Sequence, residues 1–168
     1  MTSGGQPNQF IGDGLLALFG LSVDPATACR QALRAAALVA SNVEYLNHQF
    51  AGDLLEPIQF GIGIHGGVVI IGDIGYRERT VFTALGDAVN VAARLQDLTK
   101  SLNCKHIASD DVYKLAGIVS DVLKLEQVSI RGRDQPVAVR TTEDPTVLSS
   151  LLDDVLDEPQ QPVTTAAE

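Results

Sequence analysis

Apolar residues recur at helical spacing in some stretches of this chain and as short β-branched runs in others, which indicates an α+β domain. A long amphipathic helix is predicted from Asp24-Pro25, an N-cap followed by proline at the first helical position, to about Gln49. A second helix is predicted to begin with Asp87 as its N-cap. Shorter helices are predicted to begin at Ser109 and to span Asp144–Leu156.

Short runs rich in Val and Ile predict strands that are separated by glycine-containing turns. The first two strands form a hairpin between Gly4 and Gly20, and a tight turn at His65-Gly66 is predicted to join the next two. Those two and the later strands are predicted at Ile58–Ile64, Gly67–Ile74, Val81–Ala84, His106–Ala108, Val122–Ile130 and Val137–Arg140. Helices packed on such a mostly antiparallel sheet make an α+β fold.

The net charge of −9 is unevenly placed and separates a body from an acidic tail. Seven acidic residues and no Lys or Arg follow Arg140, so residues 1–140 carry a net charge of only −2. A nearly neutral body argues against nucleic-acid binding. We expect one domain over residues 1–140 and a solvated, partly disordered tail over residues 141–168.

Cysteine use and hydropathy restrict the cellular setting. The two cysteines, Cys29 and Cys104, lie in no CxxC motif or Cys/His cluster, so reduced thiols and a cytoplasmic location are expected. No apolar run approaches the length of a membrane span, and the chain does not open on a signal-peptide pattern.

The segment Thr83–Leu95 places an amide and a guanidinium together on one face of the second predicted helix. Asn90 and Arg94 are four residues apart, and neither belongs to the apolar stripe of that helix. A forked cation beside a neutral hydrogen-bonding group suits the oxygens of a reacting phosphate. The alternative is a solvated helix face.

The segment Gln9–Gly20 predicts a strand, a Gly-Asp-Gly turn and a second strand. Asp13 is thereby placed at the tip of a tight hairpin, where it is either a functional carboxylate or only a turn-forming residue.

The stretch Gly61–Gly66 matches the dinucleotide-binding pattern GxGxxG. That pattern requires a helix after its third glycine, whereas a strand pattern follows here, so a Rossmann-type site is disfavoured. The glycines are expected instead to permit a tight hairpin and close backbone packing. His65 has no second His or Cys at ligand spacing and is interpreted as a turn residue.

Taken together, Gln9–Gly20, Phe60–Gly67 and Thr83–Leu95 resemble the catalytic domain of class III adenylate/guanylate cyclases, in the order and approximate spacing of that family. The resemblance runs from about Gly4 to Arg140. It implies a ferredoxin-like core and the conversion of a nucleoside triphosphate to a 3′,5′-cyclic nucleotide and pyrophosphate.

The resemblance also implies roles for individual residues. Asp13 matches the second of two aspartates that bind two divalent cations, for which a carboxylate on a turn suits Mg²⁺ or Mn²⁺. Asn90 matches the amide that orients the ribose. Arg94 matches the guanidinium that stabilises charge around the α-phosphate.

Two further arginines match phosphate-binding positions of the family. Arg131 stands where the family often has a lysine that binds the terminal phosphates, and its alternative is an exposed hairpin charge. Arg79 lies in a loop where relatives carry a phosphate-facing arginine, although the nearby Arg77 leaves that alignment open.

The base-reading positions of the family fall on Gln9 and Thr83. Thr83 meets the adenylate cyclase pattern, whereas Gln9 replaces the usual lysine. Because a glutamine amide can donate to a ring nitrogen and accept from an exocyclic amine, ATP is the expected substrate.

The chain departs from the family upstream of Asp13. The family's first metal aspartate lies several dozen residues before the second, yet no acidic residue precedes Asp13 here. We therefore expect the chain to lack the first strand of the family. We also expect it to have little or no activity alone, since one carboxylate cannot hold two cations.

Sites of this family form between two subunits, so the resemblance implies a homodimer or pairing with an intact cyclase domain. The alternatives are a non-catalytic regulatory subunit and a nucleotide-binding module without chemistry. A diguanylate cyclase is disfavoured because the chain has no Gly-Gly-Asp/Glu-Glu-Phe run.

Overall fold

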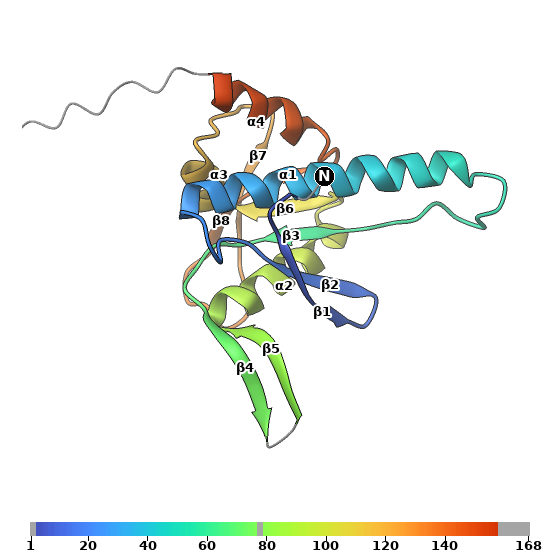
Figure 1. Ribbon diagram of the computed structural model, residues 1–168. Helices are drawn as coiled ribbons and strands as arrows, with labels where there is room; N and C mark the ends of the chain where they lie inside the picture. Colours follow the sequence, from blue (N-terminus) through green and yellow to red (C-terminus); the bar gives the residue numbers. More distant parts are fainter. Residues whose placement is uncertain (1–2, 77–78, 158–168) are drawn as a thin grey trace, which may run out of the picture.

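A four-stranded sheet forms the centre of the computed structural model, which describes residues 3–76 and 79–157 (Figure 1). Its strands lie in the order β3 (Ile62–Ile64), β6 (His106–Ser109), β8 (Val137–Thr142) and β7 (Lys124–Val128). β3 and β6 are parallel, whereas β8 pairs antiparallel with both β6 and β7. The predicted closing hairpin is therefore present as β7 and β8.

Helices cover both faces of this sheet, and its inner strand β6 is therefore buried on both sides. Ile107 and Ala108 lie on opposite faces, as neighbours in a strand do, and neither is exposed. Ile107 packs in one apolar cluster with helix α2 (Asp87–Ser101). Ala108 belongs to the other cluster, which contains residues of α1 (Pro25–Gln49), α3 (Asp110–Ala116) and α4 (Val147–Asp157). The predicted α+β architecture is confirmed.

Helix α1 begins where the sequence predicts. Asp24 accepts a hydrogen bond from the backbone N–H of Thr27 at 3.0 Å, and Pro25 lies in the first turn. The buried positions of α1 extend from Ala28 to Ala40, where the helix packs on α3 and α4. Beyond Ala40 the helix projects from the body of the domain (Figure 1).

Two antiparallel hairpins extend away from α4 (Figure 1). One consists of β1 (Gln6–Ile11) and β2 (Gly14–Leu18), as predicted. The other consists of β4 (Ile70–Tyr76) and β5 (Arg79–Leu85), and residues 77–78 between them lie outside the described residues.

The prediction of a tight turn at His65-Gly66 that joins two paired strands is wrong. The strand before it, β3, pairs with β6, and the strand after it, β4, pairs with β5. A side chain at Gly63 would collide with the backbone of α2 at Ala92 and Gln96. This glycine therefore permits close packing of helix against strand and does not mark a hairpin.

The predicted strand over Ile58–Ile64 is shorter than expected and begins only at Ile62. The Asn47 amide on α1 donates to the Ile58 carbonyl at 3.1 Å, and its oxygen accepts from the Ile58 N–H at 2.7 Å. Both backbone groups of Ile58 are thus engaged by α1, so they do not take part in a strand ladder.

The helix predicted in the acidic tail is present as α4, and its apolar side is part of the core. Leu148 and Leu152 are buried in the same cluster as α1 and α3, and Asp153 pairs with Arg34 of α1 at 3.0 Å. Residues 158–168 lie outside the described residues. Among the described helices, none combines the length and apolar character needed to cross a membrane.

Candidate active site

The structure divides the seven predicted site residues between two parts of the molecule. The first part is the β1–β2 hairpin with the adjoining strand β5, and the second is helix α2 with the connection between β7 and β8. The first part carries Gln9, Asp13, Arg79 and Thr83, and the second carries Asn90, Arg94 and Arg131. Arg79 begins β5, but its side chain is outside the described part of the structure.

Helix α2 presents Asn90 and Arg94 away from its buried side. Val91 and Leu95 are fully buried in the apolar cluster against the sheet, which fixes the rotation of the helix about its axis. Asn90 is exposed, whereas Arg94 is partly buried and its Nη1 donates to the backbone carbonyl of Arg131. The predicted helix is confirmed. Asn90 and Arg94 lie one turn apart on it, and the Arg94 side chain contacts the β7–β8 connection.

Arg131 lies in a tight turn between β7 and β8. The backbone N–H of Arg133 donates to the carbonyl of Ile130 at 3.0 Å, which closes the turn. Gly132 has a φ of +83°, a conformation that favours glycine. Arg131 itself is exposed, so the turn presents its guanidinium to solvent beside α2.

The sequence predicts Asp87 as the N-cap of α2, and this prediction is wrong. In the structure Asp87 is the first helical residue. Gly86 is the N-cap and makes no side-chain cap bond. The Oδ2 atom of Asp87 accepts from Nε of Arg133 at 3.1 Å and from Nη2 at 2.5 Å. These bonds hold the pKa of Asp87 below its ordinary value.

This ion pair was missed by sequence reasoning because its partners are 46 residues apart. An aspartate in the first turn of a helix is explained by the helix dipole alone, and an arginine in a hairpin turn is explained by solvation. The sequence contains no local signal that links the two.

The predicted base-reading residues lie where β1 meets β5. The Thr83 hydroxyl donates to Oδ1 of Asn8 at 3.1 Å, and Nδ2 of Asn8 donates to the carbonyl of Phe82 at 2.8 Å. The pairing of β1 with β2 is irregular at this point, between Pro7 and Gln9. Gln9 is exposed next to Asn8, a connecting residue that the sequence analysis did not single out.

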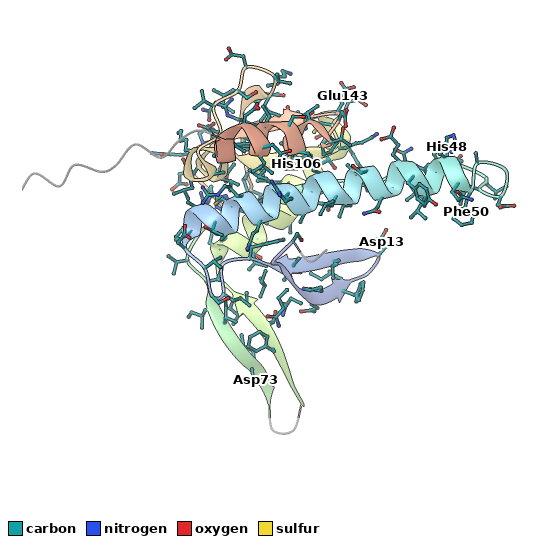
Figure 2. The ribbon with its side chains drawn as sticks, turned by 45° about the horizontal axis from the view of Figure 1, so that its top comes forward. Asp13, His48, Phe50, Asp73, His106 and Glu143 are labelled. Atoms are coloured by element: carbon teal, nitrogen blue, oxygen red, sulfur yellow. The ribbon has the colours of Figure 1, made fainter. Side chains whose placement is uncertain are left out.

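Asp13 lies at the tip of the β1–β2 hairpin, as predicted, and is exposed. Gly12 has a φ of +63°, which the turn requires. Figure 2 shows Asp13 at the end of this hairpin and Asp73 on the other hairpin. Within residues 3–76 and 79–157, no group of three or more His, Cys, Asp or Glu side chains converges as a metal site.

His65 is bonded by its Nδ1 to the Ser109 hydroxyl at 2.9 Å, and burial lowers its pKa below the ordinary value. The residue lies in a cleft beside Arg133, which is lined by His65, Asp111 and residues 133–138. The neutral ring holds β3 to the start of α3, which is a structural role.

Residues 8–141 match the family described as the adenylate and guanylate cyclase catalytic domain. The chain belongs to this family. The match includes both parts of the candidate site and ends before α4, so the last described helix of this cyclase domain lies outside the family pattern.

A curated adenylate cyclase from Anabaena cylindrica is 35% identical to the cyclase domain over 144 residues. The alignment covers 82% of this chain and 28% of that protein. The chain spans less than a third of the length of the first curated relatives it matches.

Solved cyclase structures share the fold of this cyclase domain. The guanylyl cyclase Cya2 is 27% identical with a TM-score of 0.69, covering 83% of this chain and 70% of that chain. The adenylyl cyclase CyaB from P. aeruginosa is 22% identical with a TM-score of 0.70, covering 83% of this chain and 71% of that chain. The predicted cyclase fold is confirmed, and the choice of base has to be argued from side chains.

Proposed function

We propose that this cyclase domain takes part in converting ATP to 3′,5′-cyclic AMP and pyrophosphate, at a site completed by a second cyclase domain. The observation that carries the proposal is the grouping of Asn90 and Arg94 on α2 beside the Arg131 turn. An adenylate cyclase is among the relatives that are similar to most of this chain, which supports the same assignment.

In the proposed reaction, the ribose 3′-hydroxyl gives its proton to solvent as its oxygen attacks the α-phosphorus. The bond between the α-phosphorus and the oxygen that bridges to the β-phosphorus breaks, and pyrophosphate leaves with that oxygen. Arg94 stabilises the negative charge that develops around the α-phosphate, and Arg131 binds the terminal phosphates. Asn90 orients the ribose through its amide. Positioning and charge neutralisation are the main demands of phosphoryl chemistry, and these side chains meet them.

Adenine is the proposed base because of the side chains where β1 meets β5. The exposed amide of Gln9 can donate and accept at once, which matches a ring nitrogen beside an exocyclic amine. The partly buried Thr83 hydroxyl is held in place by Asn8 and retains lone pairs for the base.

Asp13 fits one Mg²⁺ or Mn²⁺ in donor type, since both cations prefer carboxylate oxygen. Within the described residues, Asp13 belongs to no group of three or more His, Cys, Asp or Glu side chains that could hold a metal ion, and a single carboxylate is too few ligands for a pair of cations. We therefore propose that the chain, alone or as a homodimer, has little or no cyclase activity and that an intact partner domain supplies the missing ligands. Both cysteines are free, in keeping with the proposed cytoplasmic setting.

The test is a cyclase assay with Mn²⁺ and either ATP or GTP. This chain is assayed alone and mixed with the intact adenylate cyclase domain from Anabaena cylindrica in which the residue aligned with Arg94 is replaced, with association followed by sedimentation. We expect cyclic AMP only from the mixture. Robust cyclic AMP from the purified chain alone would refute the need for a partner, and cyclic GMP in excess would refute the choice of base.

A regulatory, non-catalytic role is the second candidate, and the isolation of Asp13 favours it. In that case the chain associates with the intact domain and changes the activity of an unsubstituted partner. It adds no activity to a partner that lacks its own arginine.

A further inference from the structure

The turn that carries Arg131 is fastened to helix α2 at two points. On one side the Arg94 guanidinium donates to the carbonyl of Arg131. On the other side the Arg133 guanidinium donates through Nε and Nη2 to one carboxylate oxygen of Asp87, at 3.1 and 2.5 Å. The turn is therefore held at two points of α2 that are seven residues, or about two helical turns, apart, and one of them is the predicted transition-state arginine.

We propose that the Asp87–Arg133 ion pair is a latch that positions Arg131 for the terminal phosphates of the nucleotide. The inference rests on the proposed function of this site. Asp87 and Arg133 do not touch the substrate in this scheme, so they are positioning residues, and Arg131 and Arg94 make the phosphate contacts.

The geometry favours positioning over a direct contact by Arg133. Two of its N–H donors already point at Asp87, and the opposite charges of the pair cancel at the site. The net field on a bound phosphate therefore comes from Arg94 and Arg131. What the pair adds is restraint on a turn whose glycine, Gly132, would otherwise allow many conformations.

The exposure of the pair indicates a local effect. The Arg133 and Asp87 side chains are 38% and 59% exposed, and exposed ion pairs contribute little to the stability of a whole domain. Breaking the latch is thus expected to leave the fold intact and to free only the turn of residues 130–133.

The first experiment is a calorimetric titration of the 168-residue chain with tripolyphosphate, comparing Asp87→Asn with wild type. We expect the dissociation constant to rise about five- to tenfold, as for the loss of one charge-assisted contact. The direction of the change in the dissociation constant is informative, because removing a negative charge near an anion site would by simple electrostatics strengthen binding. Asp97→Asn, an exposed aspartate further along α2, is the matched control and is expected not to weaken binding.

Amide exchange provides a readout that does not depend on any ligand. In Asp87→Asn the amide of Arg133, which closes the turn, is expected to exchange about tenfold faster, with the rest of α2 and the sheet unchanged. The reciprocal double variant Asp87→Arg with Arg133→Asp restores an ion pair. It is expected to recover both slow exchange and tripolyphosphate affinity.

Unchanged exchange in Asp87→Asn would show that the pair does not restrain the turn and would overturn the latch. Faster exchange with unchanged or tighter tripolyphosphate binding would overturn the positioning role and assign the phosphate contact to the released Arg133. Failure of the proposed function is recognised separately, as absence of cyclic AMP from the partner mixture while the exchange difference persists.

Discussion

The two parts of the candidate site differ in how the chain holds them. On α2, Arg94 and the Arg131 turn are joined by hydrogen bonds within the chain, above the fully buried Leu95. On the β1–β2 hairpin, Asp13 lies at an exposed tip and Phe10 is 77% exposed. The proposed phosphate-binding part is thus assembled by the packing of this chain, whereas the proposed metal ligand Asp13 lies at a tip without comparable support.

The physical reason is the number of elements that each part contacts. Helix α2 packs on β3 and β6 and contributes to an apolar cluster, so its orientation is fixed from the core outward. A two-stranded hairpin by itself is only marginally stable, and β1–β2 is joined to the other hairpin through Asn8 and its neighbours on β5. This asymmetry predicts which substitutions in the chain will affect activity with a partner.

The largest effect is expected from Arg94→Ala in the mixture with the arginine-deficient partner. In the proposed reaction, the complete site of that mixture uses the metal ligands of the partner and Arg94 of this chain. Loss of its transition-state charge should lower cyclic AMP formation by about 10²- to 10³-fold. Initial rates at saturating MnATP, with association followed by sedimentation, provide the measurement.

Asp13→Asn is the matched variant from the other part of the site, and in the same mixture it should leave the rate unchanged. In the proposed dimer, Asp13 of this chain contributes to the second site, in which the partner lacks its arginine, whereas Gln9 of the same hairpin contributes to the site of Arg94. An equal loss of rate in both variants would contradict the assignment of Asp13 and Arg94 to different sites.

The free energy of unfolding provides a second comparison between α2 and the β1–β2 hairpin. Leu95→Ala removes a fully buried side chain from the core-facing side of α2 and is expected to lower the free energy of unfolding by about 2–5 kcal/mol. Leu15→Ala on β2, where the side chain is 53% exposed, should cost less than about 1 kcal/mol. Urea unfolding followed by circular dichroism measures both, and similar losses would show that the hairpin is as well packed as α2.

Much of the fold could be predicted from the sequence because local signals and the tertiary structure agree. The aspartate cap and proline of α1 and the apolar stripe of α2 specify these helices locally. The error at His65-Gly66 arose because a glycine that permits close packing has the same sequence signal as a glycine in a turn. Only the approach of α2 to Gly63 distinguishes the two.

The candidate site was predictable to the extent that it depends on local spacing. The one-turn separation of Asn90 and Arg94 and the turn at Asp13 follow from helix and hairpin geometry. The contacts of Asp87 with Arg133 and of Thr83 with Asn8 join residues 46 and 75 positions apart. Such pairs are set by the packing of whole elements and leave no mark in the sequence around either residue.

A further effect concerns pH and the sheet that supports α2. His106 on β6 is completely buried, and burial lowers its pKa to about 3 from the ordinary value of 6.5. The unfolded chain therefore binds a proton below about pH 6.5 that the folded chain does not. Stability should fall as pH decreases through this window toward about 3, by at most about 1.4 kcal/mol per pH unit for this group.

His106→Gln tests this prediction, since the amide does not titrate and can still bond the Tyr113 hydroxyl, which lies 3.3 Å from Nδ1 of His106. Urea unfolding at pH 7 and pH 5 should show a smaller loss of stability in the variant than in wild type. Burial also lowers the pKa of His65, so His65→Asn serves as the comparison. A pH dependence that is unchanged in His106→Gln and abolished in His65→Asn would assign the acid sensitivity to the cleft beside Arg133 and not to the sheet beneath α2.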